Sequence, residues 1–178
     1  MPDTATESTA TAPMAAPLRW LWLAVVVIAL DLGSKWLAVT HLEYRQPFTL
    51  ISGFFDLTLL YNHGAAFSFL ADHSGWQRWL FALIAIVAVV GLTLWLKRLK
   101  RTQKMMAASL ALIIGGAIGN LCDRMSHGFV VDFLSFHWHD VYYYPAFNIA
   151  DSAITIGAIM LIIDAFRAPR KAIKAERS

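Results

Sequence analysis

The chain has 178 residues, of which 58% are hydrophobic and 15% are charged, and its mean hydropathy is +0.54. A soluble domain carries roughly a quarter charged residues, so this composition excludes an ordinary soluble protein. The formal net charge of +3 could indicate a nucleic-acid partner. The basic residues, however, cluster beside long apolar segments, which favours a membrane protein and argues against nucleic-acid binding.

From its N-terminus, the chain contains first a polar tail and then several long apolar segments. Residues 1–17 are rich in Ala, Thr and Pro and lack periodicity, so we expect a disordered cytoplasmic tail. Four later segments approach the about 20 apolar residues that a spanning helix needs. They are Leu18–Val39, Trp76–Leu96, Met105–Cys122 and Ala146–Phe166. We therefore predict an all-α membrane protein, with four transmembrane helices in one domain over residues 18–166 and a basic cytoplasmic tail over residues 167–178.

Lys and Arg are concentrated on one side of the predicted helices. One cluster lies between the second and third helices and another follows the fourth, whereas the other two connections contain few basic residues. The clusters are Lys97, Arg98, Lys100, Arg101 and Lys104, and Arg167, Arg170, Lys171, Lys174 and Arg177. By the positive-inside rule, both termini are cytoplasmic, and the connections at about residues 44–70 and 125–145 face outward.

The first outward region predicts a small β-sheet outside the membrane. Phe48–Ile51 and Phe54–Tyr61 are rich in strand-forming residues and flank a Ser-Gly turn. The second outward region, about residues 125–145, is rich in turns and aromatic residues. We expect it to form a loop close to the lipid headgroups.

Several polar side chains occur near the outward ends of the predicted helices, where burial in lipid is costly. Asp31 and Lys35 are four residues apart, so on a helix they can form an ion pair, which we interpret as structural. The stretch Gly115–Gly119 has the small-xxx-small pattern of close helix contacts. That pattern does not explain Asn120 and Arg124, which offer an amide and a guanidinium fork to a ligand.

Two carboxylates have no obvious basic partner in the sequence. Asp132 follows the third helix in an apolar stretch, and Asp151 lies about one turn inside the fourth helix with Asn148 on the same face. Two carboxylates held together in a low dielectric share a proton, and such a pair supplies a general base and a general acid. The alternative is one capping Asp and one buried, hydrogen-bonded Asp. Spacing alone does not decide between these interpretations.

Metal and cofactor chemistry have little support in the sequence. His137 and His139 with Asp140 provide too few clustered ligands for a convincing metal site. There is no Gly-rich phosphate loop after a strand and no H-E-x-x-H motif. We therefore expect neither a metal nor a cofactor.

Two other functions would use the same polar residues. A small proton-coupled carrier could relay protons through Asp31, Asp123 and Asp151. A relay should extend through the membrane, whereas these residues cluster towards one side and only Asp164 could extend them. A non-enzymatic scaffold could instead hold a lipid headgroup with Arg124 and the aromatic outward loop.

Five blocks of polar and small residues occur in order along the predicted membrane domain. They are Asp31-x-x-Ser34-Lys35, Asn62-x-Gly64-Ala65-Ala66-Phe67-Ser68, Gly115-Gly116-x-x-Gly119-Asn120-x-x-Asp123-Arg124, Val131-Asp132-Phe133 and Phe147-Asn148-x-Ala150-Asp151-Ser152. With these blocks, the chain from about Trp20 to Phe166 resembles the bacterial lipoprotein signal peptidase family, signal peptidase II. One block alone would be weak, but five in order on four apolar helices are specific.

The resemblance implies an intramembrane aspartyl endopeptidase that removes signal peptides from diacylglyceryl-modified prolipoproteins, cleaving just before the lipidated cysteine. It implies that Asp132 and Asp151 are the catalytic pair. It also implies two supporting sets of residues: Asn62, Gly116, Asn120, Arg124 and Asn148 for substrate binding, and Asp31, Lys35 and Asp123 for structural polar support. The expected location is the bacterial inner membrane, among membrane lipids, with the site near the periplasmic face. A monomer would suffice, because one chain contains both carboxylates.

Overall fold

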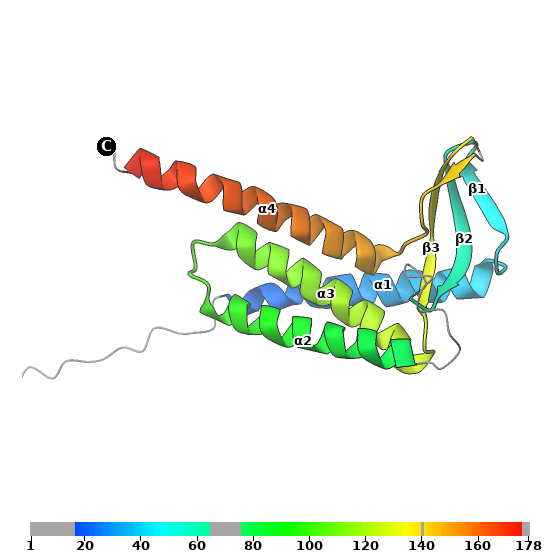
Figure 1. The fold of residues 1–178 in the computed structure, drawn as a ribbon, viewed down its shortest axis with the longest axis horizontal. Coiled ribbons are helices and arrows are strands. Elements are labelled where there is room, and N and C mark those ends of the chain that lie inside the picture. Colours follow the sequence, from blue (N-terminus) through cyan, green and yellow to red (C-terminus); the bar gives the residue numbers. More distant parts are fainter. Residues whose placement is uncertain (1–16, 65–75, 140, 176–178) are drawn as a thin grey trace, which may run out of the picture.

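The structure is a computed structural model that describes residues 17–64, 76–139 and 141–175. Four long helices lie side by side, and a small sheet stands across one end of them (Figure 1). The helical elements are η1 (Leu18–Trp20), α1 (Leu21–His41), α2 (Trp76–Arg98), α3 (Lys104–Ser126) and α4 (Ile149–Ala175), and the strands are β1 (Pro47–Ile51), β2 (Phe55–Asn62), β3 (Val130–Trp138) and β4 (Tyr142–Tyr143). The predicted tail before Pro17 lies outside the described residues, as do residues 65–70 of the first outward region.

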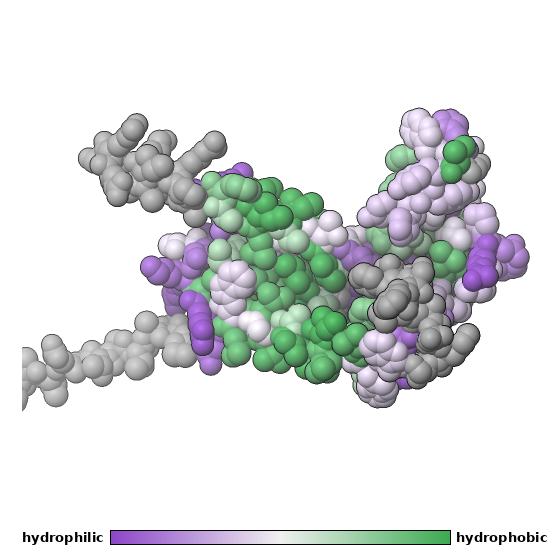
Figure 2. Space-filling view, viewed as in Figure 1, coloured by the Kyte–Doolittle hydropathy of each residue, from purple (hydrophilic) through white to green (hydrophobic). Residues whose placement is uncertain are grey.

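All four helices are long and apolar enough to cross a membrane, which confirms the predicted spans. Figure 2 shows an apolar band over the helices, with hydrophilic residues at the end away from the sheet and on the sheet itself. The fourth helix differs at both ends from the prediction. It begins at Ile149 and continues to Ala175, so the helix extends into the basic segment predicted over residues 167–178.

Helix α3 is the most buried of the four helices, and its glycines allow close contacts. A Cβ at Gly115 would lie 2.8 Å from the Val27 Cβ of α1, and a Cβ at Gly119 would meet the Asp31 carboxylate. The small-xxx-small prediction is thereby confirmed, since both glycines face α1. On α4, a Cβ at Gly157 would lie 2.7 Å from the carbonyl oxygen of Ser109.

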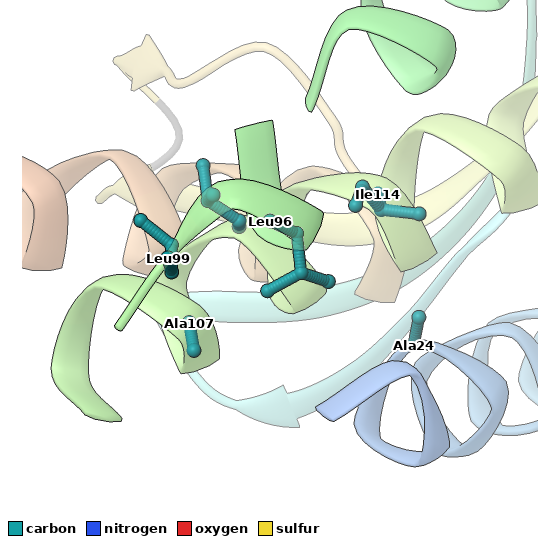
Figure 3. Packing of buried hydrophobic residues seen from close by; sticks show 6 residues of the cluster. Ala24, Leu96, Leu99, Ala107 and Ile114 are labelled. Carbon is teal, nitrogen blue, oxygen red and sulfur yellow. The ribbon is translucent and has the colours of Figure 1, made fainter. Parts of the chain in front are cut away.

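The buried apolar residues form two clusters at opposite ends of the helices. One cluster joins the first turns of α1, the end of α2 and the beginning of α3 (Figure 3), and contains Ala24, Leu96, Leu99, Ala107, Leu110 and Ile114. The second joins the C-terminal end of α1 to the sheet, and contains Ala38, Leu59, Val131 and Phe133. The sheet is thus anchored to the helices by an apolar contact of its own.

The sheet contains four strands in the order β1-β2-β3-β4, and each neighbouring pair is antiparallel. Strands β1 and β2 confirm the predicted hairpin. The predicted loop over about residues 125–145 is wrong in part, because Val130–Trp138 forms the third strand and Tyr142–Tyr143 the fourth. The hydrogen-bonding partner of β3 is β2, which lies far away in the sequence, so local sequence patterns do not reveal the pairing.

Candidate active site

The two candidate carboxylates lie where the sheet meets the ends of the helices. Asp132 is in β3 and only 2% exposed, and Asp151 is in the first turn of α4. Each carboxylate is surrounded by asparagine amides contributed by other elements. The predicted residues Asn62, Asn120 and Asn148 all belong to this polar network.

Asn148 links both carboxylates. It immediately precedes α4, and its Oδ1 accepts a hydrogen bond from the backbone N–H of Asp151 (2.9 Å), while Asp151 Oδ2 lies 3.3 Å from the backbone N of Asn148 and accepts its hydrogen bond. This reciprocal pattern is a capping box. The Asn148 Nδ2 donates to Asp132 Oδ1 at 2.7 Å. The start of α4 therefore positions Asp151 and holds Asp132 through one side chain.

Asn120 of α3 holds Asp151 from the other side. Its Nδ2 donates to Asp151 Oδ1 at 2.7 Å, and its Oδ1 accepts from the Lys35 ammonium at 3.0 Å and from Asn148 Nδ2 at 3.2 Å. Because an ammonium can only donate, Lys35 fixes the orientation of this amide. The NH₂ group of Asn120 must then face Asp151.

Asn62, the last residue of β2, holds Asp132. Its Nδ2 donates to Asp132 Oδ2 at 3.0 Å, and its Oδ1 accepts from the backbone N–H of Gly64 at 2.9 Å. Gly64 has φ +95° and lies against the Phe81 ring, a backbone conformation and a close contact that favour glycine. This tight turn fixes the amide of Asn62, so that its NH₂ group faces the carboxylate.

Burial and a neighbouring charge make Asp132 a weaker acid than an ordinary aspartate. The pKa of Asp132 is raised from its ordinary value of 3.8 to about 6. Burial is the largest cause and the charge of Asp151 adds to it, whereas the hydrogen bonds from Asn62 and Asn148 act in the opposite direction. A carboxyl group of this kind holds a proton more readily than a solvated aspartate. The arrangement can therefore offer a proton at Asp132 beside a carboxylate at Asp151.

Beneath the carboxylates, Lys35 lies between two other acids. Its ammonium is 2.7 Å from Asp31 Oδ2 and 2.9 Å from Asp123 Oδ2. Asp31 Oδ1 also accepts from the N–H of Ala150 at 2.9 Å, and Asp123 Oδ2 accepts from the N–H of Val131 at 3.0 Å. The cluster thus connects α1, α3, α4 and β3 directly below the backbone of both candidate carboxylates.

Two predicted substrate-binding residues are placed differently from the asparagines. The Arg124 guanidinium lies 5.4 Å from the centre of the Phe81 ring and donates to the carbonyl oxygen of Asn120 at 3.3 Å. Gly116 is buried in the contact with α4, where an added Cβ would meet the carbonyl oxygen of Ala150. Helix packing fills the space around Gly116, so we propose no ligand contact for it.

One polar pair in the sheet was not predicted as a pair. Asp56 of β2 and His137 of β3 are both buried, with His137 Nε2 3.2 Å from Asp56 Oδ2. The two residues are remote in sequence, and only the strand pairing brings them together. Within the described residues, no group of three or more His, Cys, Asp or Glu side chains could hold a metal ion.

Comparison with known proteins identifies the family. The profile of the family described as "Signal peptidase (SPase) II" matches residues 23–167. Proteins named "Lipoprotein signal peptidase" are 56% identical in Pseudomonas aeruginosa PAO1, over 86% of this chain and 90% of that protein, and 51% identical in Pseudomonas syringae pv. tomato DC3000, over 96% of each. A solved structure described as "Bacterial membrane enzyme structure by the in meso method at 1.9 A resolution" has a TM-score of 0.73 and 31% identity, over 83% of this chain and 92% of that one. The chain belongs to the signal peptidase II family.

Proposed function

We propose that this protein removes signal peptides from diacylglyceryl-modified prolipoproteins, cleaving just before the lipidated cysteine. Family membership supports a prolipoprotein substrate and aspartic-type protease chemistry. The observation that carries the proposal is the position of Asn148, which caps Asp151 and donates to Asp132. One rigid helix start therefore holds both carboxylates of the catalytic pair.

The surroundings of the two carboxylates suggest different roles. Asp151 lies in the first turn of α4, where the helix dipole favours a negative charge. It takes a proton from a water molecule, whose oxygen attacks the scissile carbonyl carbon. Asp132 holds a proton more readily and donates it to the leaving amide nitrogen as the C–N bond breaks. The products are a carboxylic acid and an amine, and proton exchange within the pair restores the enzyme.

The remaining predicted residues have supporting roles in this proposal. Asn62, Asn120 and Asn148 orient the carboxylates through the amide donors described above. Arg124 interacts electrostatically with both Asp151 and Asp132, and we assign it to substrate binding. Asp31, Lys35 and Asp123 support the site from below, because their hydrogen bonds hold the backbones of α4 and β3.

The membrane placement follows from charge and from the position of the site. The basic last turn of α2, with Lys97 and Arg98, and the first residue of α3, Lys104, belong to the end of the bundle away from the sheet. The positive-inside rule therefore supports a cytoplasmic location for this end and for both termini. The carboxylates then lie near the periplasmic face of the inner membrane. A substrate whose signal helix and acyl chains already occupy the bilayer can approach them sideways from the lipid.

An apolar cavity fits the lipid part of such a substrate. It has a volume of ≈ 410 Å³ and lies between the outward end of α1 and the sheet, where Leu37, Leu42, Leu57 and Phe133 contribute to its lining. Phe133 directly follows Asp132 in the chain. Because apolar surface gains free energy on leaving water, we assign this cavity to an acyl chain of the substrate or of a membrane lipid.

The test of the proposed function is cleavage of a lipidated precursor by purified enzyme, measured by gel shift. Asp132→Asn and Asp151→Asn should each abolish cleavage, while binding of the precursor persists. Asp164→Asn is the matched control, because Asp164 lies on α4 but far from the amide network. The control should cleave at the rate of the unsubstituted enzyme, and substantial cleavage by either dyad variant would refute the assignment.

The same variants separate the peptidase from the proton-coupled carrier. In a carrier, Asp164 is the acid that would extend a relay towards the cytoplasmic side, so its neutral variant should lose function. In the peptidase, only the outward pair takes part in bond cleavage. Family membership does not support the carrier.

A further inference from the structure

A buried pair of polar side chains, Asp56 and His137, lies in the sheet outside the proposed catalytic pair. Asp56 is 3% exposed and His137 is 5% exposed, and their closest side-chain atoms are 3.2 Å apart. The His137 ring stacks on Tyr143 of β4, with ring centres 5.1 Å apart. Burying charged or polar partners is costly, and buried pairs often contribute more to a specific arrangement than to stability.

The pair holds two strands whose register changes between it and the proposed active site. On one side of the change, Asp56 lies opposite Ser135, and Leu57 lies opposite Leu134. On the other side, Leu60 lies opposite Asp132. Two residues of β2 therefore face one residue of β3, which is a β-bulge.

The bulge determines which way Asn62 points. With the bulge, Asn62 lies opposite Val130, so its side chain shares a face with Asp132, two residues further along β3. Without the bulge, the register at Asp56 would continue, and Asn62 would lie opposite Phe129. A shift of one residue turns a side chain to the other face of a sheet, and the bond from Asn62 to Asp132 would be lost.

We propose that Asp56 and His137 form a register lock that keeps the bulge between themselves and Asp132. The lock fixes the pairing of β2 and β3 on the side of the bulge away from Asp132. On the other side of the bulge, Asn62 then keeps its amide on the carboxylate of Asp132. Asp56 and His137 are thus positioning residues, and this inference rests on the proposed function. Two polar links, one on each side of the bulge, confine the extra residue to the segment between them.

The first test is a double-mutant cycle in the cleavage assay. Asp56→Ala and Asn62→Ala should each lower kcat about tenfold to a hundredfold, the effect expected for losing a hydrogen bond to a charged group. Because both changes remove the same bond to Asp132, the double variant should be no slower than the slower single variant. A double variant in which the two losses multiply would overturn the proposal, as would an Asp56→Ala variant with unchanged kcat. Thermal melting in detergent serves as the control, because it shows whether each variant is folded at the assay temperature.

The second test replaces the contact between Asp56 and His137 with a covalent link. Asp56 and Ser135 are directly opposed in the sheet, so Asp56→Cys with Ser135→Cys can form a cross-strand disulfide. The oxidised double variant should regain cleavage and the reduced one should not, although the contact with His137 is absent from both. Ser135→Cys alone keeps the pair and should cleave normally. Equal rates in the oxidised and reduced states, or failure of the cysteines to bridge, would contradict the lock.

These outcomes are distinct from failure of the proposed function. If the function is wrong, the unsubstituted enzyme will not cleave the lipidated precursor. If only the register lock is wrong, the unsubstituted enzyme will cleave it and the cycle or the disulfide will give the contrary result.

Discussion

At the scale of single residues, Asn62, Asn148 and Asn120 have the same hydrogen-bonding pattern. Each has its side-chain oxygen occupied by a backbone N–H or an ammonium group, and these donors are the N–H of Gly64, the N–H of Asp151 and the Lys35 ammonium. Each NH₂ group is therefore turned towards a carboxylate. The orientation of these amides follows from the hydrogen-bond network, which keeps the donors aligned before any substrate arrives.

The raised pKa of Asp132 predicts a pH-dependent stability. The folded protein holds this proton up to a pH of about 6, whereas an ordinary aspartate releases it near 3.8, so between these values the folded state binds more protons than the unfolded one. The free energy of unfolding should therefore fall as pH rises from about 4 to about 6, by at most about 3 kcal/mol, and level off above. Asp132→Asn should remove this dependence in thermal melts in detergent, while Asp164→Asn keeps it. An identical slope in the Asp132 variant would contradict the assignment.

At the scale of elements, the sequence reveals the helices and only part of the sheet. A helix in lipid must satisfy its backbone internally over a fixed length, so hydropathy alone finds α1 to α4. Strand β3 is buried along both faces, which removes the alternating pattern by which a strand is recognised. The ion pair of Asp31 and Lys35 was predictable because four residues on one helix separate the partners. The links from Asn62 to Asp132 and from Asp56 to His137 depend on the pairing of β2 with β3.

The contact between α3 and α4 gives a prediction at the same scale. A Cβ at Gly116 would meet the backbone of Ala150 and lie 2.8 Å from Ile154 Cγ1, so a larger residue must push α4 away. Gly116→Leu should lower the melting temperature by several degrees, since overpacking costs about 1–3 kcal/mol, and should reduce cleavage because Asp151 moves with α4. Gly91→Leu is the matched control, since a Cβ there meets nothing within 4 Å. Equal melting temperatures for the two variants would show that α4 is not held through this glycine.

At the scale of the whole molecule, the arrangement separates membrane anchoring from chemistry. The apolar band covers the helices, and the polar network lies at the end covered by the sheet (Figures 1 and 2). The sheet is packed on α1 and α4 through an apolar cluster, so β3 carries Asp132 as a firmly attached strand. The acid from the sheet and the acid from α4 meet only when the sheet is docked on the helices. The proposed active site therefore forms only when the tertiary structure is complete.

Because one chain supplies both carboxylates, each molecule should contain a complete active site. We expect a mixture of purified Asp132→Asn and Asp151→Asn proteins to cleave no more precursor than either protein alone. In an enzyme whose site is shared between two chains, mixing would re-form some intact sites, up to about a quarter of them in a random dimer. The mixture is incubated in detergent and then in reconstituted vesicles, so that subunits have the chance to exchange, and cleavage is measured by gel shift. Recovered activity in either setting would show that Asp132 of one chain works with Asp151 of another. Continued inactivity beside an active unsubstituted enzyme supports a site contained within one chain, in which the network from Lys35 through Asn120 to Asp151 needs no second copy.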